Sequence, residues 1–125
     1  MFFSLSSKHA VYMSKSVDTV NLGGQTVRYG LLGSADASHT LLVFNGIGAS
    51  LEAVLPFADH FKTTRILAFD VPGGGGSPTP LIPYRFTGLS RLVARMLDHL
   101  GIDKVDVFGV SWGGAAAQQF ARDYP

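Results

Sequence analysis

The sequence reads Gly109-Val110-Ser111-Trp112-Gly113 close to its C-terminal end, which fits the pattern Gly-x-Ser-x-Gly. The pattern follows an apolar run at 105–110 that predicts a buried strand, and it precedes an alanine-rich segment that predicts a helix. A serine between a strand and a helix requires a sharp, strained turn, and flanking glycines remove side chains that would collide there. We therefore expect Ser111 to stand exposed as a candidate catalytic nucleophile. The alternative is a glycine-rich turn in which Ser111 only caps the helix.

Main-chain amides near this turn predict a site for a developing negative charge. The Trp112 N–H opens the following helix, where the helix dipole is positive. A second amide is expected from Ile47, in the loop Asn45-Gly46-Ile47-Gly48 that follows an earlier apolar run. Gly46 would let the backbone approach a substrate, and the Asn45 side chain could hold the loop. Taken without the pattern at Ser111, this loop would be an ordinary helix-entry turn.

The rest of the chain alternates between strand and helix signals, and these predict the order of the elements. A hairpin is expected from the alternating runs at 17–22 and 25–32, joined by Gly23-Gly24. The further expected elements are buried strands at 40–44 and 65–69, a helix from a cap at Ser50 to about Phe61, a Gly/Pro-rich loop at 71–83, and a helix capped by Thr87 and closed by Gly101.

This order predicts a mostly parallel sheet that follows the hairpin and carries helices on both faces. Residues 1–16 are expected to form a flexible N-terminal tail, and residues 17–125 to form one incomplete domain, because no linker is long enough to divide them. The apolar edge at 104–110 would lack a neighbouring strand and would invite pairing with another strand. We therefore expect this chain to be the N-terminal part of a larger domain.

Composition excludes several classes of protein. The chain has 125 residues, with ten basic and nine acidic side chains, and no basic stripe that would follow a nucleic-acid backbone. It has no cysteine, so neither disulfides nor thiolate metal sites are available, and a cytoplasmic location is compatible. No apolar run approaches transmembrane length. We expect no metal, no cofactor, no nucleic-acid partner and no transmembrane segment.

The sequence does not supply the partners that a catalytic serine needs. A serine hydroxyl is activated by a histidine, which is oriented by an acid, and in this arrangement both follow the serine. No histidine follows Ser111, and Asp123 is the only later acid. We expect Asp123 and the four earlier histidines to be solvated side chains, and the chain alone to be inactive; those histidines are His9, His39, His60 and His99.

A second class of function, nucleotide binding, rests on the same loop. Gly46-Ile47-Gly48 follows a strand, and Asp70 ends the next strand, as in a dinucleotide fingerprint. Leu51 occupies the position of the third glycine, where its bulk would push the helix away from the strand. This hypothesis is therefore weaker, and the turn from Asp70 to Ser77 is interpreted as structural.

Together these motifs resemble the intracellular poly(3-hydroxyalkanoate) depolymerases of the α/β-hydrolase superfamily. The resemblance runs from about Leu41 to Pro125 and rests on blocks in the same order: Val43-Phe44-Asn45-Gly46-Ile47-Gly48-Ala49, Phe69-Asp70-Val71-Pro72-Gly73, Pro83-Tyr84-Arg85-Phe86 with Ala94-Arg95-Met96-Leu97-Asp98, and Val110-Ser111-Trp112-Gly113-Gly114 with Ala117-Gln118-Gln119-Phe120-Ala121.

The resemblance implies an α/β-hydrolase fold and cytoplasmic hydrolysis of ester bonds in storage polyester granules, through an acyl-enzyme on Ser111. It also implies that the acid, the histidine and a lid over the site come after Pro125. Because one scaffold serves many substrates, a general carboxylesterase or lactonase remains an alternative, as does a non-catalytic fragment.

Overall fold

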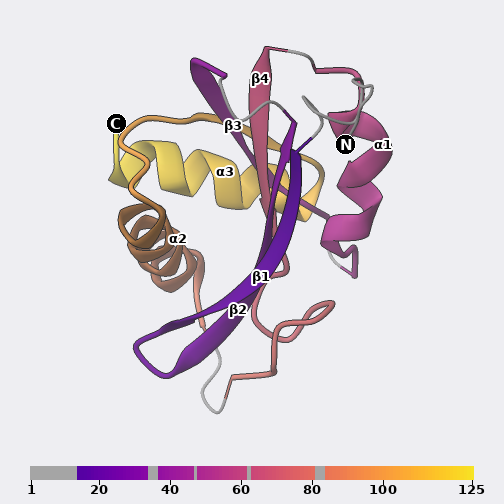
Figure 1. Cartoon of the computed structure of the whole chain (residues 1–125). Helices are drawn as coiled ribbons and strands as arrows, with labels where there is room; N and C mark the ends of the chain where they lie inside the picture. The colour runs from indigo at the N-terminus through magenta and orange to yellow at the C-terminus, as the bar shows by residue number, and fades with distance from the viewer. Residues whose placement is uncertain (1–13, 34–36, 47, 62, 81–83) are drawn as a thin grey trace.

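A computed structural model describes residues 14–33, 37–46, 48–61, 63–80 and 84–125 of the chain. Five strands form one sheet in the order β1-β2-β4-β3-β5, as Figure 1 shows. The strands are β1 (Ser14–Leu22), β2 (Gln25–Gly33), β3 (His39–Phe44), β4 (Thr64–Phe69) and β5 (Asp106–Gly109). The helices are the 3-10 helix η1 (Leu51–Val54) and the α-helices α1 (Leu55–Ala58), α2 (Phe86–Leu100) and α3 (Trp112–Asp123).

The sheet is mixed, and the predicted hairpin is confirmed. β1 and β2 pair antiparallel, and the turn between them has positive φ at Gly23 (64°) and Gly24 (98°). β2 is also antiparallel to β4, whereas β3 runs parallel to both β4 and β5. The three strands that follow the hairpin are therefore parallel to one another, so their carboxyl ends lie at one edge of the sheet.

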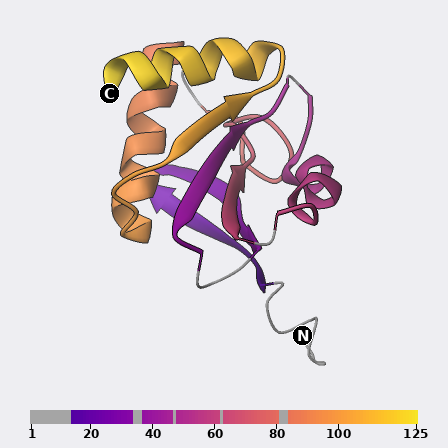
Figure 2. The same cartoon turned by 90° about the horizontal axis from the view of Figure 1, so that it is seen from above.

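Helices cover both faces of the sheet, as predicted. Figure 2 shows α2 and α3 on one side of the strands and α1 on the other. On the side of α2 and α3 the core is centred on Phe44, whose ring lies 5.4 Å from that of Phe69 and 5.9 Å from that of Phe120. On the opposite side, η1 and α1 pack against Val43 and Ile66. The two central strands, β3 and β4, are thus buried on both faces.

The predicted helix from Ser50 to Phe61 is wrong in its length, whereas Ser50 does occupy the N-cap position. The segment forms one 3-10 turn followed by a four-residue α-helix, and the Ser50 side chain makes no capping hydrogen bond. Pro56, in the first turn of α1, has no N–H and so cannot donate to a carbonyl in η1. The hydrogen bonds of one continuous α-helix therefore cannot form across this segment.

Two other boundaries also differ from the prediction. α2 begins at Phe86 with Arg85 as its N-cap, two residues before the expected cap at Thr87. The C-cap is Gly101 with a φ of 69°, as the sequence predicts. β5 is an edge strand rather than a buried one, with Phe108 exposed by 42%.

Of the N-terminal tail expected at 1–16, residues 1–13 lie outside the described residues. The last three residues of that expected tail belong to β1, which begins at Ser14. Within the parts of the chain that are described, no helix has both the length and the hydropathy needed to cross a membrane.

Candidate active site

Ser111 lies in the sharp turn that the sequence predicts. Its φ of 56° and ψ of −120° make it the only non-glycine residue with positive φ among the described residues. The turn is closed by hydrogen bonds from the Gly113 N–H to the Val110 oxygen (2.9 Å) and from the Gly114 N–H to the Ser111 oxygen (2.8 Å). Such backbone costs about 1–3 kcal/mol and is concentrated at functional sites. Ser111 is exposed, so its hydroxyl is open to a ligand.

The two glycines of the pattern are required by the packing around this turn. A Cβ atom on Gly109 would lie 2.3 Å from the carbonyl oxygen of Gly113. A Cβ atom on Gly113 would lie 2.1 Å from the carbonyl oxygen of Phe44. Neither position has room for a side chain, because each obstacle is a backbone carbonyl oxygen: that of Gly113 in α3 for Gly109, and that of Phe44 in β3 for Gly113. The pattern thus reflects the close approach of α3 to the end of the sheet.

The loop after β3 lies beside the Ser111 turn. The Val110 N–H donates to the Phe44 oxygen (3.1 Å), which joins the ends of β5 and β3. A Cβ atom built on Gly46 would lie 4.0 Å from the Cβ atom of Ser111. The Asn45 Nδ2 atom donates to the Ser50 carbonyl (3.0 Å), so its side chain holds the loop closed as expected. Ile47, the expected amide donor of this loop, lies outside the described residues.

Trp112 supports the turn from the side of α2. It is the first residue of α3, a position at which the N–H has no acceptor within the helix. Its half-buried ring lies 5.2 Å from the ring of Phe86, between centroids, at an interplanar angle of 40°. The first turn of α2 therefore packs against the residue that follows Ser111.

An ionic network that runs from the buried Asp70 to the exposed Glu52 lies at the other end of the loop. The Asp70 side chain is fully buried and accepts three hydrogen bonds: from the Leu51 N–H (2.7 Å), from the Gly76 N–H (2.8 Å) and from Nη1 of Arg28 (3.0 Å). Arg28 belongs to β2 and also pairs with the Glu52 carboxylate of η1. Asp70 therefore links the hairpin, η1 and the glycine-rich turn.

The pairing of Arg28 with Glu52 favours the charged form of both side chains. Hydrogen bonds to Glu52, first, and to Asp70 raise the pKa of Arg28. The hydrogen bond from Arg28 is also the main cause that lowers the pKa of Glu52 to about 2. This network was not predicted from the sequence, although the four consecutive glycines at 73–76, shortly after Asp70, were a signal for it. A Cβ atom on Gly75 would lie 2.4 Å from the Asp70 carboxylate, so the turn wraps closely around that group.

This network also argues against a nucleotide site. A dinucleotide fingerprint needs an exposed carboxylate at the end of the second strand to bind a ribose hydroxyl. Asp70 has that position in the sequence, but its side chain is fully buried and its oxygens are engaged by Leu51, Gly76 and Arg28.

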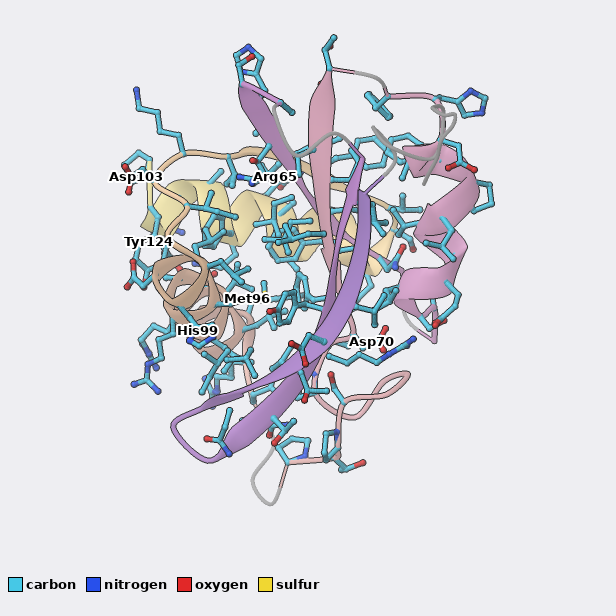
Figure 3. All side chains as sticks on the ribbon, in the orientation of Figure 1. Arg65, Asp70, Met96, His99, Asp103 and Tyr124 are labelled. Atoms are coloured by element: carbon cyan, nitrogen blue, oxygen red, sulfur yellow. The ribbon has the colours of Figure 1, made fainter. Side chains whose placement is uncertain are left out.

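The three described histidines and the late acid belong to segments other than the Ser111 turn, and His9 lies outside the described residues. His39 begins β3, whereas the loop beside Ser111 follows the end of that strand. His99 lies in the last turn of α2 (Figure 3) and His60 is an exposed residue after α1. Asp123 accepts hydrogen bonds from Gln119 at the end of α3, which places it roughly 18 Å along the helix from Ser111.

A groove of about 720 Å³ lies at the opposite edge of the sheet. It is lined by the first residues of β3 and β5 and by the ends of α2 and α3, including Asp103 and Tyr124, which Figure 3 labels near the C-terminus. Its walls contain no part of the Ser111 turn. Over the described ranges, no group of three or more His, Asp or Glu side chains could hold a metal ion.

Comparison with protein families and known proteins agrees with this geometry. Residues 39–125 match the family model described as the alpha/beta hydrolase fold. The chain is 55% identical over 108 residues to a poly(3-hydroxyalkanoate) depolymerase of Ectopseudomonas oleovorans, a match that covers 86% of this chain and 38% of that protein. It is 31% identical over 112 residues to 3-oxoadipate enol-lactonase 2 of Acinetobacter baylyi, covering 86% of this chain and 40% of the relative.

A solved structure shares the same arrangement of strands and helices. The crystal structure of a bacterial membrane phospholipase A superposes with a TM-score of 0.81 at 28% identity, covering 89% of this chain and 36% of that one. The chain therefore spans about two fifths of the length of the proteins that it matches.

Proposed function

This chain belongs to the α/β-hydrolase family, and we propose that it carries the nucleophile of a serine ester hydrolase that depolymerises poly(3-hydroxyalkanoate). One observation carries the proposal: Ser111 is exposed at positive φ beside the loop that follows β3. The 55% identity to a depolymerase supports the choice of substrate. The polyester is thus the proposed partner, at the surface of a storage granule.

In the proposed reaction, the Ser111 Oγ attacks the carbonyl carbon of an ester. Its proton passes to a base, and the carbonyl oxygen becomes an oxyanion that the Trp112 and Ile47 amides bind. When the oxyanion collapses, the C–O bond to the leaving alcohol breaks, the alcohol takes the proton, and the acyl group stays on Ser111. Water then attacks the acyl-enzyme, releasing the acid and restoring the hydroxyl.

Among the described residues, no histidine belongs to the Ser111 turn or to the loop beside it. We propose that the base and its orienting acid belong to sequence equivalent to the part of the depolymerase that this chain does not match. Residues 1–125 alone should then show no ester hydrolysis that depends on Ser111, because an unpaired serine hydroxyl is a weak nucleophile at neutral pH. A Ser111-dependent rate from this segment alone would contradict the assignment of the base.

A lactonase or general carboxylesterase is the second candidate. It is supported by the 31% identity to an enol-lactonase, because lactones are cyclic esters and require the same nucleophile. A cytoplasmic location belongs to the same proposal and is compatible with the absence of cysteine.

The test uses the protein that its source expresses, with residues 1–125 and whatever follows them. Its hydrolysis of polyester granules is compared with that of short soluble esters and lactones. We expect granule hydrolysis, an acyl adduct on the peptide containing Ser111, and loss of both in Ser111→Ala. Ser38→Ala, which removes an exposed hydroxyl at the other edge of the sheet, is the matched control. Hydrolysis of soluble esters without any effect on granules would favour the second candidate.

A further inference from the structure

The loop that lies beside Ser111 is held at both of its ends. At its start, β3 ends at Phe44, whose carbonyl accepts the Val110 N–H (3.1 Å). At its end, the Leu51 N–H donates to Oδ1 of Asp70 (2.7 Å). Between these points, Asn45 Nδ2 donates to the Ser50 carbonyl (3.0 Å) and fixes one part of the loop to the other.

The anchor at Asp70 is the only charged one of the three. A carboxylate that accepts N–H hydrogen bonds in a buried site holds them more strongly than a neutral carbonyl does. Asp70 is itself held by Arg28 from β2, which lies on the other side of β4 from β3. Figure 3 shows Asp70 on the side of the sheet where η1 and α1 lie.

The cradle around Asp70 fits a carboxylate of this size. A Cβ atom on Gly75 would lie 2.4 Å from its Cγ and Oδ2 atoms, and one on Gly76 would lie 2.4 Å from Cδ of Arg28. The Gly76 N–H donates to Oδ2 (2.8 Å). Asp70 therefore cannot move toward the turn, and its Oδ1 atom is fixed where Leu51 needs an acceptor.

From these contacts we propose that Asp70 is a positioning residue for the oxyanion site: its carboxylate fixes Leu51 and thereby the distance between the 45–50 loop and Ser111. This inference rests on the proposed function and names a residue that acts on the rate of acylation without touching substrate. Loss of the anchor would release Ser50, and with it Asn45 and Gly46, from their place beside Ser111, and misplacement by about 1 Å lowers a rate by roughly 100-fold.

The first test measures kcat and KM separately in the protein that its source expresses. Asp70→Ala should lower kcat for a soluble ester by roughly 100-fold and change KM by less than about threefold. Thr40→Val is the matched control, because Thr40 is a buried polar residue on β3 that accepts hydrogen bonds from Arg65 on β4, at the strand ends remote from Ser111. It should destabilise the fold while kcat stays within about twofold of the wild type.

A second pair of variants covers the case in which Asp70→Ala does not fold. In Asp70→Asn only one side-chain oxygen remains, and the charged Arg28 and the Gly76 N–H compete for it, so the amide NH2 faces the Leu51 N–H and cannot accept from it. Adding Arg28→Gln supplies a neutral acceptor for that NH2 group. We expect Asp70→Asn to lose most of the rate and the double variant to recover at least tenfold of it.

The second test does not depend on activity. Hydrogen exchange at the Leu51 amide should be slow in the wild type and in Thr40→Val, and fast in Asp70→Asn. An equal loss of kcat in Asp70→Ala and Thr40→Val, or a protected Leu51 amide in Asp70→Asn, would overturn this inference alone. A wild type with no turnover that Ser111→Ala abolishes would instead overturn the proposed function.

Discussion

Gly113 lies directly against the carbonyl group of Phe44. A Cβ atom on Gly113 would come within 2.1 Å of that oxygen and within 2.4 Å of the carbonyl oxygen of Asn45. Gly113 belongs to the first turn of α3, whereas Phe44 ends β3, which lies between β4 and β5 in the sheet. Neither group can retreat unless a helix or a buried strand moves with it.

Gly113→Ala should therefore destabilise the protein by about 3 kcal/mol, at the upper end of the usual cost of overpacking, because the obstacle is backbone. The control is Gly114→Ala in the next position of α3, where the added Cβ would meet its nearest atom, the Gly109 oxygen, at an ordinary 3.6 Å. Gly114→Ala should be neutral or stabilise by about 0.5–1 kcal/mol, because alanine suits a helix better than glycine. Urea unfolding of both variants measures the difference, and equal effects would contradict this account.

The C-cap of α2 allows a test of backbone strain alone. Gly101 has a φ of 69°, and a Cβ atom there would meet nothing within 4 Å. Gly101→Ala should cost about 1 kcal/mol, because an L-residue in the left-handed region is strained even in open space. Gly101→Asn should cost less, since asparagine tolerates this conformation better than alanine. Thermal unfolding that ranks alanine above asparagine would count against strain as the cause.

The two phenylalanines of neighbouring parallel strands should differ sharply in their contribution to stability. Phe44 is 1% exposed and contacts the rings of Phe69 and Phe120, whereas Phe108 is 42% exposed and stacks on Phe57. Phe44→Ala should cost about 3–5 kcal/mol. Phe108→Ala should cost about 1 kcal/mol, the value of one aromatic pair. Denaturant titration of the two variants measures the loss in the free energy of unfolding. A similar loss in both variants would show that β5 is covered.

The pairing of Glu52 with Arg28 predicts a loss of stability in acid. Folding lowers the pKa of Glu52 from its ordinary value of 4.5 to about 2. A group with a lowered pKa in the folded state stabilises fully above its unfolded pKa, and this contribution is lost as the pH falls through the folded pKa. The free energy of unfolding should thus decline between pH 4.5 and pH 2, and Glu52→Gln should decline less over that range. If the free energy of unfolding of the wild type and of Glu52→Gln fell in parallel over this pH range, the decline would not come from the pairing of Glu52 with Arg28.

The sequence predicted the elements whose signals are local. The hairpin follows from Gly23-Gly24 between two alternating runs, and the end of α2 follows from Gly101 after an apolar stripe. The turn at Ser111 could be predicted because Gly109 and Gly113 both stand where a side chain would collide with the backbone.

The features that the sequence did not reveal depend on contacts between distant residues. Arg28 and Asp70 are 42 positions apart, and nothing in either neighbourhood names the other as its partner. Phe86, the first residue of α2, packs on Trp112, a contact between distant residues that the capping preference of Thr87 does not reveal. The broken helix after Ser50 depends on Pro56, whose effect on the backbone hydrogen bonds was not included in the prediction.

The hydrogen bond from the Val110 N–H to the Phe44 oxygen has a consequence for substrate selection. It joins the residue before Ser111 to the residue before the 45–50 loop, so thermal displacement of one segment carries the other along. This hydrogen bond fixes the start of the loop relative to Ser111, and the Asp70 anchor fixes its end. In the proposed ester hydrolysis, esters of different bulk would then meet the same fixed backbone, and discrimination between them would depend on residues that contact the rest of the substrate.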